Sequence, residues 1–525
     1  MANTGLLVLT NPTKVAKLLP IIKEHVTKTL YIQYFPEKNT FLSGNHTITN
    51  TQFKLTRYAQ IISNIYMDTS AISARLDVRV LLTTIKNSNV SIINTKKPVE
   101  IVIFDQICSK KEADSFIQDY LANTSMGCNF VTFNGDQRLE QADKATLCVN
   151  QEKTYKNVVL GGTFDRIHNG HKIFLSEAIL RCTEKLTVGV TDTNMLSGKL
   201  LWELIEPCPT RISNLKNFLE DVDTSITYDV VPIEDMYGPT KFDPTFEMIV
   251  VSEETKRGGD KVNEMRERMN LNKLDIHVVK LVSDENHRAH EESKISSSNQ
   301  RMRLLGTKLR PPRIEDKPLK PYIIGLTGGI ASGKSSVAKK LEKLGAAVVN
   351  CDTIAHDLYS PGKKCYDAVV ETFGSNILKS DGFINRKALG NIVFNDKVQL
   401  NKLNNLVWPI ILEKAKEQIN NYYAEGFDVI VMEAAVLIQA KWQHRCHEIW
   451  TCIIPQEEAI KRIIERNKLS ETDAKSRIQV QPSNTEQVNE ANVVICTLWD
   501  YNVTEEQVQQ AWNETIAFLC NQKKS

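Results

Sequence analysis

The sequence predicts an α/β protein with two doubly wound parallel sheets, preceded by a small α/β region. Apolar runs at 155–160 and 322–324 each lead into a glycine-rich turn, and each turn opens a stretch with helical spacing. After each turn, further short apolar runs alternate with helical stretches. Such alternation is typical of a parallel sheet whose ligand binds at the carboxyl ends of the strands.

The bulk composition describes a folded protein of several domains. At 525 residues the chain is too long for a single hydrophobic core. A hydrophobic fraction of 42% and a charged fraction of 24% are typical of globular proteins, and no apolar run reaches the length of a membrane span. The net charge of +2 gives no reason to expect a nucleic acid or a membrane as partner, so small molecules are the expected ligands.

The cysteines and the N-terminus bear on the compartment. The 11 cysteines are scattered without a CxxC pair, which indicates reduced thiols and a cytoplasmic protein. Mitochondrial association is the alternative, since residues 1–23 contain three lysines and no acid. A transit peptide is also rich in arginine, whereas the first arginine here is Arg57. We therefore favour a strand and an amphipathic helix at this end.

Residues 1–150 form the first predicted region. Runs at 78–82 and 99–104 predict short buried strands, and 110–121 has helical spacing. The region contains no glycine-rich phosphate loop, metal cluster or catalytic cluster that the sequence reveals. Its role stays open, and protein partners, if there are any, would bind here. We expect a chain that begins near Gln151 to keep the activities of the remainder if it folds.

Residues 151–305 form the second region, and its first turn carries two histidines. The strand ends at Gly162, and a helix begins near His171 with His168 three residues before it. Imidazoles at a helix N-terminus can donate to a phosphate while the backbone N–H groups share the load. A pair of buried or capping histidines is the alternative, and the spacing alone does not choose between them.

Further segments of this region could also bind phosphate. Runs at 186–191, 226–231 and 248–252 predict buried strands. Arg257 lies in the loop after the last of these, and a serine run at 296–298 precedes Arg301 at the start of the last helix. A serine run is more often a solvated linker, so each of these signals is weak alone.

Residues 306–321 are predicted to be a linker, because prolines and charges dominate 309–321. Residues 322–525 then form the last domain, and its first turn has the Walker A spacing. Backbone N–H groups of the turn can close around an anion, Lys334 can reach the β- and γ-phosphates, and the Ser335 hydroxyl can bind Mg²⁺. The predicted phosphate-binding residues are Gly328, Gly329, Ile330, Ala331, Ser332, Gly333, Lys334, Ser335 and Ser336.

Two acids and three arginines complete the candidates in the last domain. Asp352 follows the apolar run 346–349, either beside the phosphates or as the cap of the next helix. Glu433 ends the run 428–432. Arg462 and Arg466 share one helix face, and Arg477 follows; such a group is usually solvated, but here it resembles a mobile lid. The helical pattern of 400–424 is predicted to break near Trp408 and Pro409.

The motifs resemble two enzyme families. Residues 162–165 (Gly-Thr-Phe-Asp) with 168–171 (His-Asn-Gly-His) are similar to the T/HxGH nucleotidyltransferases, which have a Rossmann-like fold. Residues 252–255, the glycines at 258–259 and the serines at 296–298 narrow this to eukaryotic phosphopantetheine adenylyltransferases. The P-loop region resembles dephospho-CoA kinase. Fused in this order, the two resemble the bifunctional coenzyme A synthases of animals.

The resemblance implies roles in adenylyl transfer from ATP to 4′-phosphopantetheine. His171 would stabilise the pentacovalent phosphate, with Thr163, His168 and Gly162 nearby. Lys199 would clamp the incoming phosphate, and Arg257 and Arg301 are further candidates. Ser296, Ser297 and Ser298 would hold ATP phosphates. No covalent intermediate is needed, so positioning and charge stabilisation would carry this step.

For the kinase, the resemblance makes Asp352 the base that accepts the proton of the ribose 3′-hydroxyl of dephospho-CoA. Glu433 would act at Mg²⁺ or at the substrate. The chain departs from the family pattern at Asn350, where a second acid is frequent, and at Asn467, where Asp is usual. ATP and Mg²⁺ are expected, without a tightly bound organic cofactor. Another small-molecule kinase in the last domain, or an inactive nucleotide-binding scaffold, are the alternatives.

Overall fold

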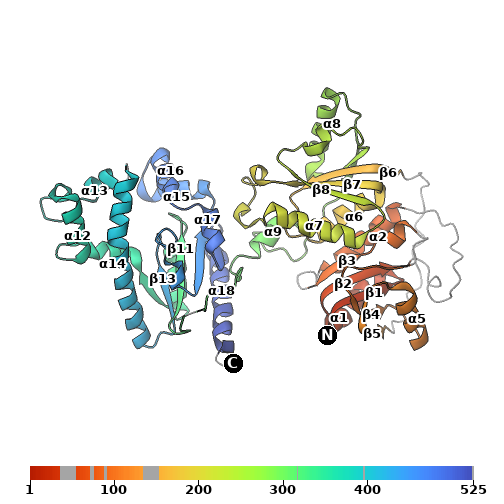
Figure 1. The fold of residues 1–525 in the computed structure, drawn as a ribbon, viewed down its shortest axis with the longest axis horizontal. Coiled ribbons are helices and arrows are strands. Elements are labelled where there is room, and N and C mark those ends of the chain that lie inside the picture. The colour runs from red at the N-terminus through yellow and green to blue at the C-terminus, as the bar shows by residue number, and fades with distance from the viewer. Residues whose placement is uncertain are drawn as a thin grey trace. The chain divides into compact units, whose positions relative to one another are not determined.

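The computed structural model describes residues 1–35, 55–70, 76–87, 92–133, 153–315, 317–393 and 396–522. The chain forms two compact units, Met1–Asn299 and Gln300–Ser525. Together they contain three five-stranded sheets in which all described strand pairs are parallel, which confirms the predicted fold class (Figure 1). The predicted boundary at 150/151 lies outside the described residues.

The N-terminal sheet is as large as the other two. Its strands are β1 (Ala2–Leu9), β2 (Val26–Tyr34), β3 (Asp77–Val80), β4 (Val99–Phe104) and β5 (Thr124–Thr132), in the order β3-β2-β1-β4-β5. Its helices are α1 (Val15–His25), α2 (Leu55–Asp68), α4 (Thr83–Lys86) and α5 (Lys110–Tyr120). The predicted strands near 78 and 99 and the helix near 110 are therefore confirmed.

The second sheet repeats this topology. Its strands are β6 (Tyr155–Gly162), β7 (Cys182–Thr191), β8 (Thr227–Ile233), β9 (Met248–Ser252) and β10 (Asp275–Val279), in the order β10-β9-β6-β7-β8. Its helices are α6 (Asn169–Arg181), α7 (Cys208–Val222), α8 (Lys256–Arg268) and α9 (Ser297–Met302). Counted from the first strand, both sheets have the order 3-2-1-4-5, and both have a register shift near the start of the first strand pair.

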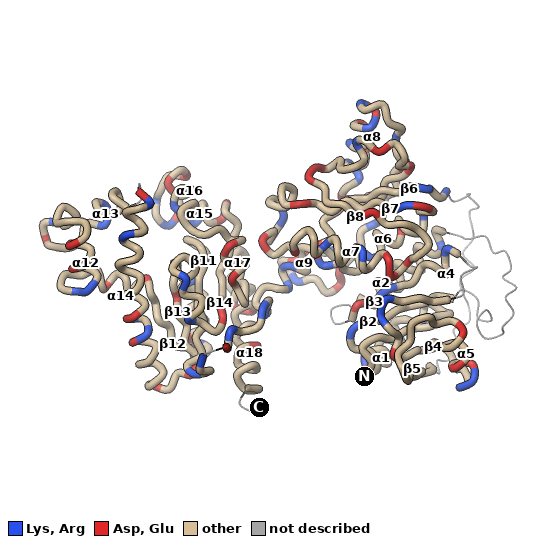
Figure 2. The backbone as a smooth tube through the Cα atoms, viewed as in Figure 1, with Lys and Arg blue, Asp and Glu red and all other residues tan. Residues whose placement is uncertain are grey.

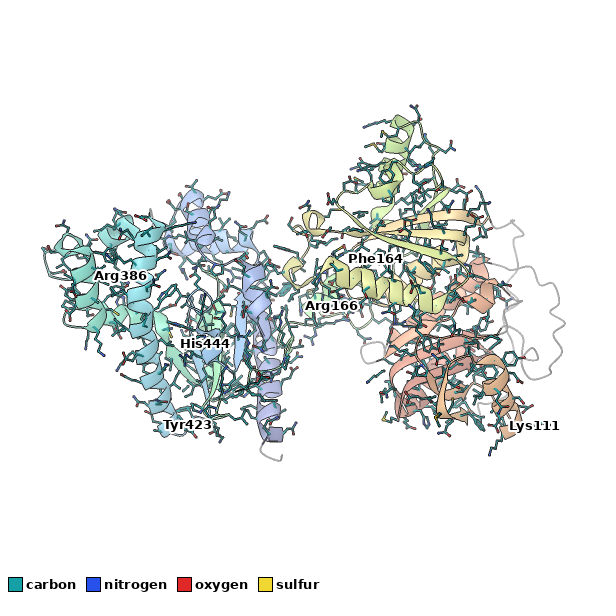
Figure 3. All side chains as sticks on the ribbon, viewed as in Figure 1. Lys111, Phe164, Arg166, Arg386, Tyr423 and His444 are labelled. Atoms are coloured by element: carbon teal, nitrogen blue, oxygen red, sulfur yellow. The ribbon has the colours of Figure 1, made fainter. Side chains whose placement is uncertain are left out.

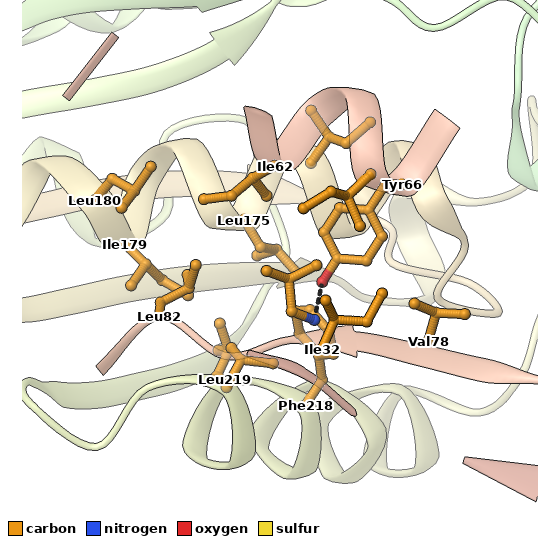
Figure 4. Close-up of a cluster of buried hydrophobic side chains, with 14 of the residues drawn as sticks. Ile32, Ile62, Tyr66, Val78, Leu82, Leu175, Ile179, Leu180, Phe218 and Leu219 are labelled. Carbon is orange, nitrogen blue, oxygen red and sulfur yellow. Dashed lines mark hydrogen bonds between the residues drawn. The ribbon is translucent and has the colours of Figure 1, made fainter. Parts of the chain in front are cut away.

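One hydrophobic core joins the two sheets of the first unit. Ile62 and Tyr66 on α2 belong to the same buried cluster as Leu175 on α6 and Phe218 on α7 (Figure 4). All four side chains are at most 2% exposed. Residues 1–132 therefore support the second sheet directly, which argues against the expectation that a chain beginning near Gln151 keeps its activities.

The second unit contains the third sheet. Its strands are β11 (Tyr322–Gly328), β12 (Ala347–Asn350), β13 (Val429–Glu433), β14 (Glu448–Ile453) and β15 (Val493–Cys496), in the order β12-β13-β11-β14-β15. Its helices are α10 (Lys334–Lys343), α11 (Cys351–Leu358), α12 (Lys364–Phe373), α13 (Arg386–Val393), α14 (Lys397–Ala424), α15 (Gln456–Asn467), α16 (Glu471–Gln479), α17 (Asn484–Glu490) and α18 (Tyr501–Gln522). Separate apolar clusters pack the α11–α14 side and the α10–α18 side.

The predicted break in the helical segment 400–424 is wrong. Helix α14 runs through Pro409 without interruption. Proline removes one backbone hydrogen bond and crowds the preceding turn. The buried residues of α14 recur at helical spacing on both sides of the proline, so packing against the core holds the helix together. These residues are Leu403, Val407, Ile411, Ala415 and Ile419.

The segment predicted to be a linker is bonded to the second unit. The backbone N–H of Gly306 donates to Val494 O at 2.9 Å, that of Leu309 to Asn492 O at 2.8 Å, and that of Arg313 to His447 O at 2.8 Å. The division between the compact units falls at 299/300, several residues before the predicted domain end at 305. Much of this proline-rich stretch is therefore bonded to the third sheet and its flanking residues.

Charges and thiols are distributed over both units. Figure 2 shows basic and acidic residues interspersed along the described chain. The cysteines within the described ranges are all unpaired. No helix in the described part is long and apolar enough to cross a membrane, and these residues contain no group of three or more His, Cys, Asp or Glu that could hold a metal ion.

Candidate active sites

The turn between β6 and α6 is tightly constrained. Phe164 and Arg166 adopt the left-handed region with φ of 50° and 49°, which is uncommon for residues other than glycine. Figure 3 labels both residues. The buried Asp165 carboxylate pairs with Arg166 at 2.9 Å and accepts the backbone N–H of Glu206 at 3.0 Å. These contacts hold the turn in a strained conformation, which is frequent at functional sites.

The two histidines stand at the start of α6 with different partners. His168 is the N-cap, and its Nδ1 accepts the backbone N–H of His171 at 3.3 Å. A neutral His168 therefore carries its proton on Nε2, which lies 3.5 Å from Ser297 Oγ. The rings stack with centroids 3.8 Å apart. The capping alternative thus holds for His168, while His171 Nδ1 is buried without a hydrogen-bond partner among the described residues.

Burial keeps both imidazoles neutral. It lowers the pKa of His171 to about 4 and places the pKa of His168 well below its usual value. The Lys172 ammonium, and His171 if it were protonated, disfavour a second positive charge and so lower the pKa of His168 further. A neutral imidazole can still donate one N–H to a phosphate oxygen, so the unpartnered ring atom of His171 suits an anionic ligand.

Arg211 holds the strand ends around these histidines, and the sequence analysis missed it. Its guanidinium is fully buried and donates to Glu206 O at 2.7 Å, Thr163 O at 2.7 Å and Thr191 O at 2.9 Å. The hydroxyl of Thr191 also donates to that of Thr163 at 3.1 Å. A signal was present, because Arg211 lies four residues before Leu215 on the apolar face of α7.

The remaining predicted residues of this region divide into two groups. Ser297 Oγ donates to Asp165 O at 3.0 Å, and Ser296 Oγ accepts the N–H of Asn299 at 3.1 Å, so both serines lie close to the turn or its support. Ser298 follows in α9. Lys199 is exposed in the loop after β7, and Arg257 is exposed in the first turn of α8. Arg301 is buried and belongs to the second unit.

In the N-terminal sheet, the equivalent turn follows β1, and its backbone N–H groups are bonded to a side chain of the same sheet. The buried Asp105 carboxylate, directly after β4, accepts the backbone N–H groups of Thr10 at 2.8 Å and Asn11 at 2.9 Å. The Lys14 ammonium donates to the Asp105 carbonyl at 2.9 Å. This turn has no histidine pair, which agrees with the absence of a catalytic motif in the sequence of residues 1–35.

The Walker A turn joins β11 to α10 as predicted. Gly333 is the N-cap with φ of 85°, and a Cβ there would lie 2.9 Å from Thr497. Only glycine therefore fits this position without strain. The Lys334 ammonium donates to Gly328 O at 2.8 Å and Gly329 O at 3.2 Å. Burial lowers the pKa of Lys334, so an incoming anion would favour its charged form.

Ser335, Glu433 and Asn350 form one hydrogen-bonded group. Ser335 Oγ donates to Glu433 Oε1 at 3.0 Å, and Asn350 Nδ2 donates to Oε2 at 2.8 Å. Burial raises the pKa of Glu433. Asn350 is also the N-cap of α11, with Oδ1 accepting the N–H of Thr353 at 2.8 Å, so the alternative that Asp352 caps this helix is wrong. Asp352 is exposed in the first turn.

The arginines of the predicted lid have different surroundings. Arg462 donates to Thr497 O at 2.7 Å, to Thr497 Oγ1 at 2.9 Å and to Ala331 O at 3.4 Å, which ties α15 to the Walker A turn. Arg466 is exposed and donates to Asn467 Oδ1 at 3.1 Å, and Arg477 is exposed on α16. Gln481 Oε1 accepts the N–H of Ile330 at 2.7 Å, a donor that the sequence assigned to phosphate.

Three parts of the chain match known families. Residues 3–132 match the COASY N-terminal domain, residues 159–303 the Cytidylyltransferase-like family, and residues 322–498 Dephospho-CoA kinase. The dephospho-CoA kinase of Carboxydothermus hydrogenoformans is 42% identical over 186 residues, which are 35% of this chain and 90% of that protein. That of Shouchella clausii is 37% identical over 194 residues, 37% of this chain and 96% of that protein. A solved dephospho-CoA kinase from Campylobacter jejuni is 28% identical to this chain. The match covers 37% of this chain and 96% of the solved chain, with a TM-score of 0.29.

The two sites and these matches define a fused transferase, in which a nucleotidyltransferase sheet precedes a P-loop kinase. The chain belongs to the bifunctional coenzyme A synthases, and its kinase part belongs to the dephospho-CoA kinase family. It is an enzyme of the last two steps of coenzyme A biosynthesis. The alternatives of another small-molecule kinase and of an inactive scaffold do not fit these matches.

Proposed function

We propose that the β6–α6 turn transfers the adenylyl group of ATP to 4′-phosphopantetheine and that the Walker A turn phosphorylates the product. One observation carries this assignment: each turn presents a buried group suited to an anion. Within the described ranges, His171 Nδ1 has no hydrogen-bond partner, and the Lys334 ammonium is bonded to neutral carbonyls of its own turn. The domains we assign are 1–150, 151–305, the join 306–321 and the kinase 322–525.

In the first reaction, a phosphate oxygen of 4′-phosphopantetheine attacks the α-phosphorus of ATP, and pyrophosphate leaves. Charge builds on the α-phosphate oxygens, and His171 donates a hydrogen bond to one of them. His168 and Arg211 hold the turn, so that Thr163 and the backbone near Gly162 stay in place. Lys199, Arg257 and the serines at 296–298 would bind phosphates, and the two exposed cations would move inward to do so.

In the second reaction, Asp352 accepts the proton of the ribose 3′-hydroxyl, whose oxygen attacks the γ-phosphorus of a second ATP, and ADP leaves. Lys334 exchanges the carbonyls of its turn for phosphate oxygens. The residues present fit Mg²⁺, since the Ser335 hydroxyl and the Glu433 carboxylate lie 3.0 Å apart and oxygen ligands suit this ion. When bound, Mg²⁺ neutralises charge on the β- and γ-phosphates. Arg466 of α15 and Arg477 of α16 close over ATP, while Arg462 anchors α15.

Two variants of the full chain test the assignment. With ATP, Mg²⁺ and 4′-phosphopantetheine, Lys334→Ala accumulates dephospho-CoA, and His171→Ala forms none but still phosphorylates added dephospho-CoA. Mass spectrometry of the products distinguishes these outcomes. Loss of both reactions in either variant, with wild-type circular dichroism, would count against two separate sites.

The unpaired cysteines support a reducing compartment for this enzyme. We assign it to the cytoplasm on that ground. Fractionation of cells, followed by detection of the protein in the cytosolic and mitochondrial fractions, tests the assignment.

A further inference from the structure

We propose that Asp77 of the N-terminal sheet is a positioning residue for the first reaction and acts through Lys172, the neighbour of His171 on α6. This rests on the proposed role of His171. The Lys172 side chain is 5% exposed, and its ammonium donates to Asp77 Oδ1 at 2.7 Å and to Val78 O at 2.8 Å. Both acceptors belong to β3, so the second turn of the catalytic helix is anchored to another sheet.

The first turn of α6 has a second anchor in the same region. Asn169 Nδ2 donates to Tyr66 O at 2.6 Å, at the end of α2. The Tyr66 hydroxyl in turn accepts the backbone N–H of Val80 at 3.0 Å, which ties α2 to β3 (Figure 4). Residues 169 and 172 therefore bond to the N-terminal part, while 168 and 171 face the phosphate turn.

The Asp77 carboxylate is itself fixed. Arg79 Nε donates to Asp77 Oδ2 at 2.8 Å, and Arg79 Nη1 pairs with Asp221 of α7 at 2.6 Å. Burial alone would raise the pKa of Asp77, but Lys172 and Arg79 outweigh it and lower that pKa. Asp77 is thus a fixed anion between two cations, and its removal leaves the Lys172 ammonium buried without an opposite charge.

The ion pair between Asp77 and Lys172 does not act on the reacting groups directly. Asp77 lies on a different sheet from the histidines and touches neither imidazole in the described contacts. Its effect on the reaction must therefore pass through the placement of α6. A shift of the reacting groups by about 1 Å can lower a rate about 100-fold, so a modest tilt of this helix is sufficient.

The test compares three full-length variants. In Asp77→Asn and Lys172→Met we expect kcat of the first reaction to fall at least tenfold, with KM values for both substrates within twofold of wild type. In the double variant, kcat should fall no further than in either single variant, because the same contact is lost in all three. Phosphorylation of added dephospho-CoA stays unchanged and serves as the internal control.

A matched control separates positioning from general stability. Lys86→Met breaks a similar ion pair between the same two parts, Lys86 with Asp223 at 3.0 Å, away from α6. We expect it to lower the melting temperature but not kcat. Unchanged kcat in Asp77→Asn, an equal kcat loss in Lys86→Met, or additive losses in the double variant would overturn the proposal. If His171→Ala keeps the first reaction, the proposed function fails independently of these results.

Discussion

Burial moves the ionisable side chains at both sites toward their neutral forms. It lowers the pKa of His171 to about 4, lowers that of Lys334 and raises that of Glu433. Each group is therefore costly to charge in the free protein. A phosphate beside Lys334 offsets this effect, so ligand binding and the charge of the lysine should be coupled.

The histidine pair makes the first unit sensitive to acid. An imidazole with a lowered pKa stays neutral in the folded chain while the unfolded chain takes up a proton below pH 6.5. Stability is therefore full above pH 6.5 and falls as the pH drops toward 4, by about 3 kcal/mol for His171 alone. Thermal melts of the full chain between pH 6.5 and 4 test whether the melting temperature falls as the pH is lowered.

His171→Asn is the control for this prediction, since it removes one of the two groups. We expect the melting temperature of the variant to fall less steeply between pH 6.5 and 4 than that of the wild type. Equal slopes would assign the acid sensitivity to other residues.

Asp352 is the single acid at the start of α11, because Asn350 occupies the other candidate position and caps the helix. Asp352→Asn should lower phosphoryl transfer by about 10²–10⁴-fold, the usual contribution of a general base, with the affinity for ATP unchanged. Single-turnover kinetics and ATP titration measure the two quantities. Near wild-type turnover would remove the base from the mechanism.

At the scale of elements, one arginine connects helix α15 to the phosphate turn. The guanidinium of Arg462 contacts Thr497 through two donors and Ala331 through one. A lysine offers a single ammonium and cannot reproduce this fork. The position of the lid helix should therefore depend on the shape of this side chain as well as on its charge.

Arg462→Lys should raise KM for ATP in the kinase reaction by about tenfold, from the loss of at least one charge-assisted hydrogen bond. Lys461→Gln, at an exposed position on the same helix, is the control and should leave KM unchanged. Steady-state kinetics with added dephospho-CoA measure both. An unchanged KM in Arg462→Lys would show that the fork is dispensable.

The strands and the phosphate turns were predictable because their signals are local. An apolar run, a glycine turn and a helical stretch lie within about 20 residues of one another at each site. The contact partners of Arg211, Asp105 and Asp77 were not predictable, because these contacts join residues 48, 95 and 95 positions apart. The helix break predicted at Pro409 was wrong for a related reason. Tertiary packing of α14 outweighs the tendency of proline to interrupt a helix.

At the scale of the whole molecule, the two compact units should differ in their tolerance of truncation. Residues 300–525 have their own sheet and cores, and should phosphorylate dephospho-CoA when expressed alone. A chain of 153–525 exposes Leu175, Phe218 and other core residues, and should lose the first reaction or aggregate. Solubility, circular dichroism and the two activities are the measurements. A soluble 153–525 chain with the full first reaction would contradict the shared core.

The anchoring of α6 by the N-terminal sheet also has a genetic meaning. A substitution that removes the Tyr66 hydroxyl, which accepts the Val80 N–H, or the Asp77 carboxylate should behave as a defect in adenylyl transfer with the kinase intact. Consider one allele with such a substitution in residues 1–299 and a second allele with a defect in the kinase unit. The two should restore growth when they are present together in one cell. Each chain would supply the reaction that the other lacks, provided that dephospho-CoA passes between them. Inherited variants of the N-terminal region would then fall into the same complementation group as those at His171.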